Sequence, residues 1–129
     1  MTLAEIREWL KSFECAENYY CGRLENKKEK SLGVYNRTRS GPPVAAIGGA
    51  SSYDVKSVSL LLHWNRNSRE TEEAALRLWE QLRAVRQTDT PGGTHIQLLE
   101  FTVPEPVAVG TDDGGIFEYV IEFNIYYRR

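Results

Sequence analysis

The chain has 129 residues, which is long enough for one domain with a substantial core. Its 41% apolar residues, 26% charged residues and net charge of −2 are typical of a folded globular protein and not of a disordered chain. This near-neutral charge argues against a dedicated nucleic-acid-binding protein, and no apolar run approaches the roughly 20 residues of a membrane-spanning helix.

The N-terminal stretch predicts an amphipathic helix. Thr2 and Glu5 have the spacing of a capping box, and apolar residues from Leu3 to Phe13 recur at helical intervals. A short strand is expected from Tyr19 to Leu24 and another from Ser31 to Asn36, with the polar residues 25–30 as a hairpin tip or mobile loop between them.

The segment from Arg23 to Arg39 is basic. It contains six basic and two acidic side chains, a net charge of +4. It is interpreted either as a solvated loop or as a contact with an acidic partner or with DNA phosphates. The candidate interface residues in this basic loop, at about 26–43, are Lys27, Lys28, Lys30, Arg37 and Arg39.

Residues 44–49 form a short apolar run that ends in a glycine pair. Gly48-Gly49 lacks the spacing of a phosphate-binding loop, so it is expected to form a tight turn or bulge.

The clearest pattern in the chain is a strand, a turn and a helix from Val55 to Val85. Alternation places Val58, Leu60, Leu62 and Trp64 on a core-facing side of the strand. On the other side lie Ser57, Ser59, Leu61 and His63.

The helix of this unit has two candidate N-caps, Asn67 and Ser68. Its apolar stripe includes Leu78, Trp79 and Leu82, whose burial contributes roughly 2 kcal/mol each. The helix is therefore expected to pack against a sheet.

The C-terminal third is expected to be mostly strand. Residues 88–94 are predicted to be a linker, residues 95–103 a strand, and Pro104 and Pro106 restrict the next piece to a sheet edge or a bend. A turn at 111–115 precedes the longest alternating stretch, 117–127, which is expected in the sheet interior.

Together these elements predict one α+β domain over residues 1–129, with a mainly antiparallel sheet and two helices packed on one face. The opposite face would then be open and would carry Leu61, His63, Val120 and Tyr126 as candidate interface residues. An open sheet face with apolar and aromatic side chains favours association.

Catalytic and metal-binding arrangements have little support. Cys15 and Cys21 are interpreted as two thiols in a reducing compartment, although a disulfide or a nucleophile paired with a histidine stays open. Asp112 and Asp113 resemble calcium ligands, but the distal glutamate of an EF-hand loop is missing. No enzymatic activity, metal or cofactor is expected.

Three parts of the chain resemble the minor capsid or tail terminator (tail completion) proteins of long-tailed phages and prophages. They are the short N-terminal helix with residues 43–49 (PVAAIGG), the VSLLLHWNRNSRETEEAALRLWEQL stretch and the terminal VAVGTDDGGIFEYVIEFNIYYRR block. The last block is the most telling, and all of these are packing patterns without chemistry.

The resemblance implies a structural role in the virion tail or neck, with assembly in the host cytoplasm. It implies a ring, a homohexamer, that caps the tail tube, stops its polymerisation and offers a docking face to the head-tail connector protein. Partners would be copies of the chain itself, the tail tube protein and the connector, without a membrane and without specific DNA binding, although DNA would pass through the ring.

Two alternatives stay open from the sequence. The first is a head-completion or connector protein of the virion, and the second is a small ligand-binding α+β domain. The second predicts a deep pocket near His63 or Cys21.

Overall fold

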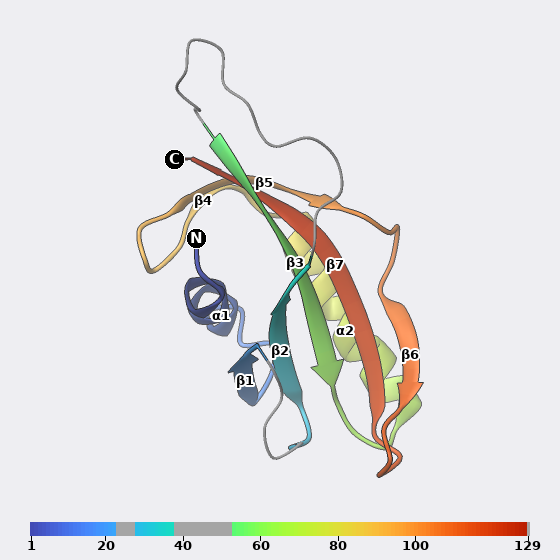
Figure 1. Ribbon diagram of the computed structural model, residues 1–129. Helices are drawn as coiled ribbons and strands as arrows, with labels where there is room; N and C mark the ends of the chain where they lie inside the picture. Colours follow the sequence, from blue (N-terminus) through green and yellow to red (C-terminus); the bar gives the residue numbers. More distant parts are fainter. Residues whose placement is uncertain (23–27, 38–52, 129) are drawn as a thin grey trace.

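The computed structural model describes residues 1–22, 28–37 and 53–128 (Figure 1). The short apolar run and the expected glycine turn or bulge at 44–49 lie outside the described residues. The elements, in chain order, are α1 (Leu3–Lys11), β1 (Asn18–Cys21), β2 (Ser31–Asn36), β3 (Tyr53–His63), α2 (Ser68–Arg83), β4 (Arg86–Asp89), β5 (His95–Phe101), β6 (Val107–Thr111) and β7 (Phe117–Arg128).

Both predicted helices are confirmed, together with their caps. The Thr2 side chain accepts a hydrogen bond from the Glu5 backbone N–H at 3.1 Å, and α1 ends at Lys11, two residues before its expected end. In α2 the N-cap is Asn67, whose Oδ1 accepts from the Glu70 N–H at 3.1 Å. The Glu70 carboxylate does not return to Asn67 but accepts from Asn65 Nδ2 at 2.9 Å.

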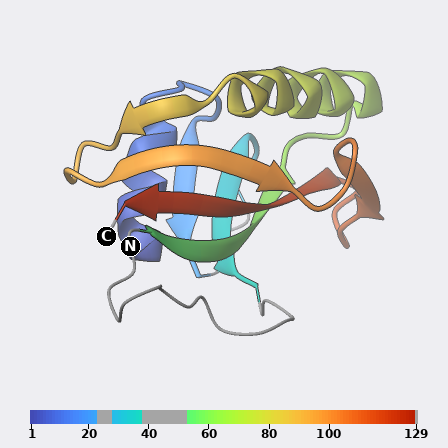
Figure 2. The same cartoon turned by 90° about the horizontal axis from the view of Figure 1, so that it is seen from above.

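The sheet has the strand order β1-β2-β3-β7-β5-β4, and β6 pairs with β7 beside the end of β5. Strand β7 is central, because β3 lies along one side of it while β5 and β6 share the other side. Figure 2 shows the strong curl of this sheet.

Both helices cover the same face of the sheet, as predicted. Side chains from α1, such as Trp9, and from α2, such as Leu78, belong to one buried cluster with Leu60 and Phe123 of the central strands. The predicted alternation of β3 is confirmed, because Val58, Leu60, Leu62 and Trp64 are all buried on this side.

The prediction of a mainly antiparallel sheet is correct only in part, because the sheet is mixed. Strands β1 and β2 pair in parallel, with Asn18 opposite Ser31 and Cys21 opposite Val34. The expected hairpin between them is therefore wrong, since a two-stranded hairpin is antiparallel.

The expected linker at 88–94 is correct only in part. Thr88 and Asp89 lie in β4, which pairs antiparallel with β5. The residues between β4 and β5 form a hairpin turn, in which the Thr90 N–H donates to the Thr94 carbonyl. Strand β4 escapes prediction because its sequence, RQTD, has no apolar alternation and its side chains are mostly exposed.

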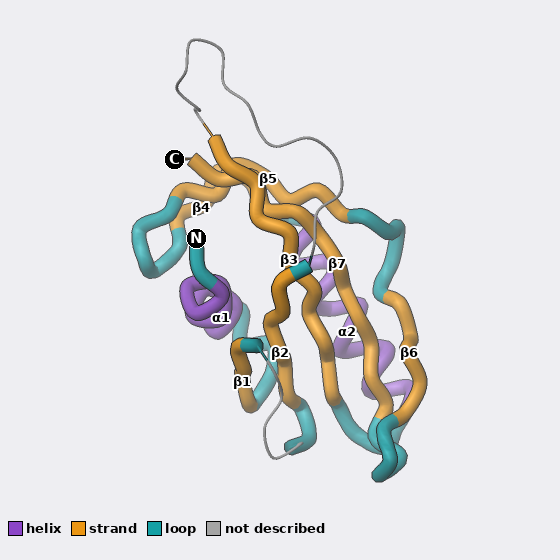
Figure 3. The backbone as a smooth tube through the Cα atoms, in the orientation of Figure 1, coloured by secondary structure: helices purple, strands orange, loops and turns teal. Residues whose placement is uncertain are grey.

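Several loops gather at one end of the sheet, at the lower side of Figure 3. The Lys30 N–H donates to the Trp64 carbonyl at 2.8 Å, and the Trp64 N–H donates to the Phe117 carbonyl at 3.1 Å. Arg66 Nε donates to the Gly114 carbonyl at 2.9 Å. The start of β2, the β3–α2 connection and the β6–β7 turn are thus tied together.

Candidate interaction surface

The sheet face opposite the helices carries a continuous apolar row. Strand pairing places Tyr20, Gly33, Leu61, Val120 and Val107 side by side across five strands. Leu61 and Val120 are half-buried, whereas Val107 is 44% exposed. The expectation that Leu61 and Val120 lie on the face away from the helices is met.

A polar network crosses the same face nearer the other end of the strands. Asn124 Oδ1 accepts from Arg37 Nη2 at 2.9 Å and from Ser57 Oγ at 2.6 Å, and Asn124 Nδ2 donates to Glu100 Oε1 at 2.8 Å. Tyr126 OH donates to the same carboxylate oxygen of Glu100 at 3.4 Å. Arg37 and Tyr126 are thus held by intramolecular contacts on this face.

His63 differs from its expected placement on an exposed surface. Its side chain is 1% exposed, with Nδ1 2.9 Å from Glu118 Oε2 and Nε2 3.6 Å from Asp112 Oδ2. Alternation correctly assigns His63 to this face, but the neighbouring β6–β7 turn, which holds Asp112, covers it. His63 links β3, β7 and this turn inside the subunit.

Two of the candidate lysines, Lys28 and Lys30, lie at the end of the sheet where β2 begins. Lys28 is exposed, and Lys30 is half-exposed with its backbone fixed by hydrogen bonds to Trp64 and Glu17. Lys27 and Arg39 lie outside the described residues. The contribution of these cations to an interface stays a prediction.

Strand β6 is an exposed apolar edge that sequence reasoning recognised as an edge but not as an interface. All five of its residues are exposed, with Val107 at 44% and Val109 at 52%. Among the described strands only β7 pairs with it, so its outer backbone groups face outward. Uncharged edge strands of this kind are templates for pairing with another chain. The signal in the sequence was VAVGT, five residues without a charge after two prolines.

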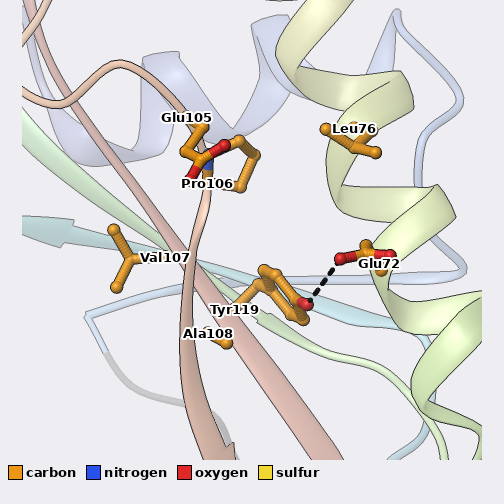
Figure 4. A pocket seen from close by; sticks show the side chains of 7 residues that line it. All are labelled: Glu72, Leu76, Glu105, Pro106, Val107, Ala108 and Tyr119. Carbon is orange, nitrogen blue, oxygen red and sulfur yellow. Dashed lines mark hydrogen bonds between the residues drawn. The ribbon is translucent and has the colours of Figure 1, made fainter.

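A groove of about 320 Å³ lies between α2 and β6 (Figure 4). Its lining includes Leu76, Pro106 and Tyr119, and the Tyr119 hydroxyl donates to Glu72 Oε2 at 3.5 Å. Burial, followed by the negative charge of Glu72, raises the pKa of Tyr119. Neither His63 nor Cys21 lines this groove or the open pockets beside α1 and along α2.

The cysteines do not form a reactive pair in this structure. Cys15 and Cys21 are half-buried free thiols. Burial raises the pKa of Cys15, which disfavours the nucleophilic thiolate at neutral pH. Burial and the neighbouring Cys15 likewise raise the pKa of Tyr19 to about 12, and the Tyr19 hydroxyl donates to Cys15 Sγ at 3.8 Å.

Asp112 of the β6–β7 turn serves the fold, whereas Asp113 is exposed. Asp112 Oδ1 accepts from the backbone N–H groups of Gly114 and Ile116, both at 2.9 Å. Within the part of the chain that the structure describes, no cluster of three or more histidine, cysteine or acidic residues is arranged to hold a metal ion. None of the described helices is long and apolar enough to cross a membrane.

The described residues thus combine a one-sided helix layer, an apolar row on the other sheet face and an uncharged edge strand, which are features that favour association with other chains. The sequence matches the family described as bacteriophage tail terminator protein over residues 4–129, and the chain belongs to this family of phage structural proteins. Comparisons with curated proteins and with solved structures gave no match. The family resemblance seen in the sequence is thereby confirmed.

Proposed function

We propose that this protein is the tail terminator of a long-tailed phage and assembles into a homohexameric ring that caps the finished tail tube. The ring stops tube polymerisation and then presents a surface to the head-tail connector protein. The family match over residues 4–129 is the observation that carries this proposal. It supports a location in the tail or neck of the virion.

The geometry supports contacts with copies of the chain and with other virion proteins. A ring subunit needs two different surfaces, because each copy contacts one neighbour on each side. The described residues offer an apolar row across the open sheet face and an exposed edge at β6. The basic loop at 26–43 is a third candidate surface, for the tube or for the ring lumen through which DNA would pass.

A phage lacking this protein tests the role directly. Without a cap, subunits continue to add to the tube, so electron microscopy should show overlong tails that wild-type protein supplied in trans returns to normal length. Tails of normal length beside unattached filled heads would instead favour the head-completion role. Particles that are indistinguishable from wild type would refute both roles.

The basic loop is tested by the triple substitution Lys27→Glu, Lys28→Glu and Lys30→Glu. If these lysines contact an acidic partner surface, the triple variant will fail to terminate tails although its circular dichroism spectrum and melting temperature stay close to wild type. The matched control variant replaces three exposed arginines of α2 with glutamate, and it should terminate tails normally. These arginines are Arg69, Arg77 and Arg83. A folded triple lysine variant that completes tails would remove this loop from the interface.

A further inference from the structure

Three described strands are outer strands, namely β1, β4 and β6. Of these, β1 and β6 lie at opposite edges of the sheet, with β2, β3 and β7 between them (Figure 1). Each of them pairs with a single strand among the described residues. Neither contains a charged side chain, since β1 reads NYYC and β6 reads VAVGT. Two uncharged edges on opposite sides of the sheet provide the two different surfaces that a head-to-tail contact between identical subunits uses.

The strand directions fit such a contact. Strand β1 runs parallel to β2, and three antiparallel pairings then lead from β2 through β3 and β7 to β6. Strand β6 therefore runs opposite to β1. A neighbouring copy related by rotation about a ring axis would bring its β1 antiparallel to β6, in the geometry of an ordinary antiparallel ladder.

The apolar row extends to both edges at the same level. Tyr20 of β1 and Val107 of β6 are the two ends of the row that passes through Gly33, Leu61 and Val120. Placing β1 of one copy beside β6 of the next brings Tyr20 close to Val107. The row would then continue from subunit to subunit.

Charges beside the two edges are opposite in sign. Residues 104–118, which contain β6 and its turn, carry four acidic and no basic side chains. Between β1 and β2, the described residues 28–30 carry two basic side chains and one acidic side chain.

Individual charges also lie at matching levels. Strand pairing places Ser31 and Gly110 in one row across the sheet. Lys28 lies three residues before Ser31 in the chain, and Asp113 lies three residues after Gly110. Both Lys28 and Asp113 are exposed. They lie at the same end of the sheet, on opposite edges.

We infer that β6 of one subunit pairs antiparallel with β1 of the next subunit, and that Asp113 and Lys28 face each other across this contact. The partner is thus a second copy of this chain. The inference rests on the proposed ring and specifies which two surfaces close it. It leaves the rest of the open sheet face for other contacts.

A charge swap tests the pairing in phage complementation. Asp113→Lys and Lys28→Glu should each lower the fraction of normal-length tails by about tenfold, because a like-charge contact is repeated at every interface of the ring. The double variant should recover close to the wild-type fraction. Matched controls at the far end of α2, Glu80→Lys and Arg83→Glu, should have little effect, because both side chains are exposed there.

Cross-linking provides a second readout that does not depend on the strength of one ion pair. In a Cys15→Ser, Cys21→Ser background, Tyr20→Cys with Val107→Cys should give a ladder of covalent oligomers in assembled tails treated with a short bismaleimide. Using Glu80→Cys, on the exposed surface of α2 outside the groove beside β6, in place of Val107→Cys should give little ladder.

The outcomes separate this inference from the proposed function. Normal tail length with no Tyr20–Val107 ladder, or cross-linking of Val107→Cys to the tube protein, would overturn the pairing while the terminator role stands. If removal of the protein leaves tail length unchanged, the proposed function itself fails.

Discussion

The Glu5 carboxylate joins the first helix to the β4–β5 hairpin. Its Oε2 accepts from Thr90 Oγ1 at 2.7 Å and from Thr94 Oγ1. A Cβ atom at Gly92 would lie only 2.8 Å from the same oxygen, so glycine lets the turn approach the helix this closely. Burial opposes the charged form, but the hydrogen bonds from Thr94 and Thr90 outweigh it and the pKa of Glu5 is lowered.

Glu5→Gln should therefore destabilise the protein near neutral pH by about 1–2 kcal/mol, because bonds from hydroxyls to a charged acceptor are replaced. The Glu5 contribution is fully present above its ordinary pKa of 4.5 and is lost as the pH falls through the lower folded-state pKa. Urea unfolding at pH 7 and at acidic pH measures this difference, which should shrink in acid.

Glu8→Gln is the matched control for this prediction. Glu8 lies on the same helix and forms an exposed pair with Lys11 at 2.9 Å, so its loss should change stability little. If the two substitutions changed the free energy of unfolding equally, the contacts from Glu5 to the hairpin would not contribute to stability.

For single residues, the sequence predicted the sheet face on which a side chain lies better than it predicted how deeply that side chain is buried. Alternation put His63 and Leu61 on the same side of β3, and the structure agrees. It could not predict that Asp112 and Glu118 would enclose His63, because these contacts join residues 49 and 55 positions away. Likewise, the sequence indicated Glu5 as the capping-box partner of Thr2 and gave no sign that the hairpin places Thr90 and Thr94 beside its carboxylate.

At the scale of elements, the choice between two N-caps of α2 can be tested directly. Asn67 has extended backbone geometry and its side chain accepts from the Glu70 N–H, whereas Ser68 is the first residue of the helix. Asn67→Ala should destabilise the protein by about 1 kcal/mol, because the first turn loses its acceptor. Chemical denaturation of both alanine variants provides the measurement, and Ser68→Ala is expected to change stability little.

The opposite ranking, with Ser68→Ala the more harmful, would mean that the helix begins one residue later in solution. This comparison is well matched because both residues are exposed and adjacent. Asn67 also receives its own backbone support, since its N–H donates to Asn65 Oδ1 at 2.9 Å.

Elements with a strong period were predictable, whereas their partners were not. The two helices and the strands β2, β3, β5 and β7 all appear near their expected positions. Alternation identifies a strand but does not show which strand pairs with it. The short connection after β1 therefore suggested an antiparallel hairpin, whereas β1 and β2 pair in parallel. The β4 strand is held by its pairing with β5 and not by apolar burial, which leaves no periodic signal.

At the scale of the whole molecule, strand pairing separates the sheet into a closed centre and open edges. Strands β3 and β7 are paired along both sides, while β1 and β6 each have one described partner. Family membership required the complete pattern, because no single residue carries a chemical signature and the match extends over residues 4–129. The open sheet face could therefore be predicted from the sequence, whereas the exposed β6 edge became visible only once the strand pairing was known.

Hydrogen exchange should distinguish the edges from the centre when the ring forms. In the unassembled subunit, backbone amides of β1 and β6 that point away from the sheet should exchange quickly, whereas those of β3 and β7 should be protected. On assembly into tails, protection should increase in residues 18–21 and 107–111 together, because one new ladder covers both edges. Mass spectrometry of peptides from free protein and from purified tails measures this change, with β7 as the internal reference. Protection that instead appears on the exposed surface of α2, with β1 and β6 unchanged, would place the subunit contact on the helical side of the molecule.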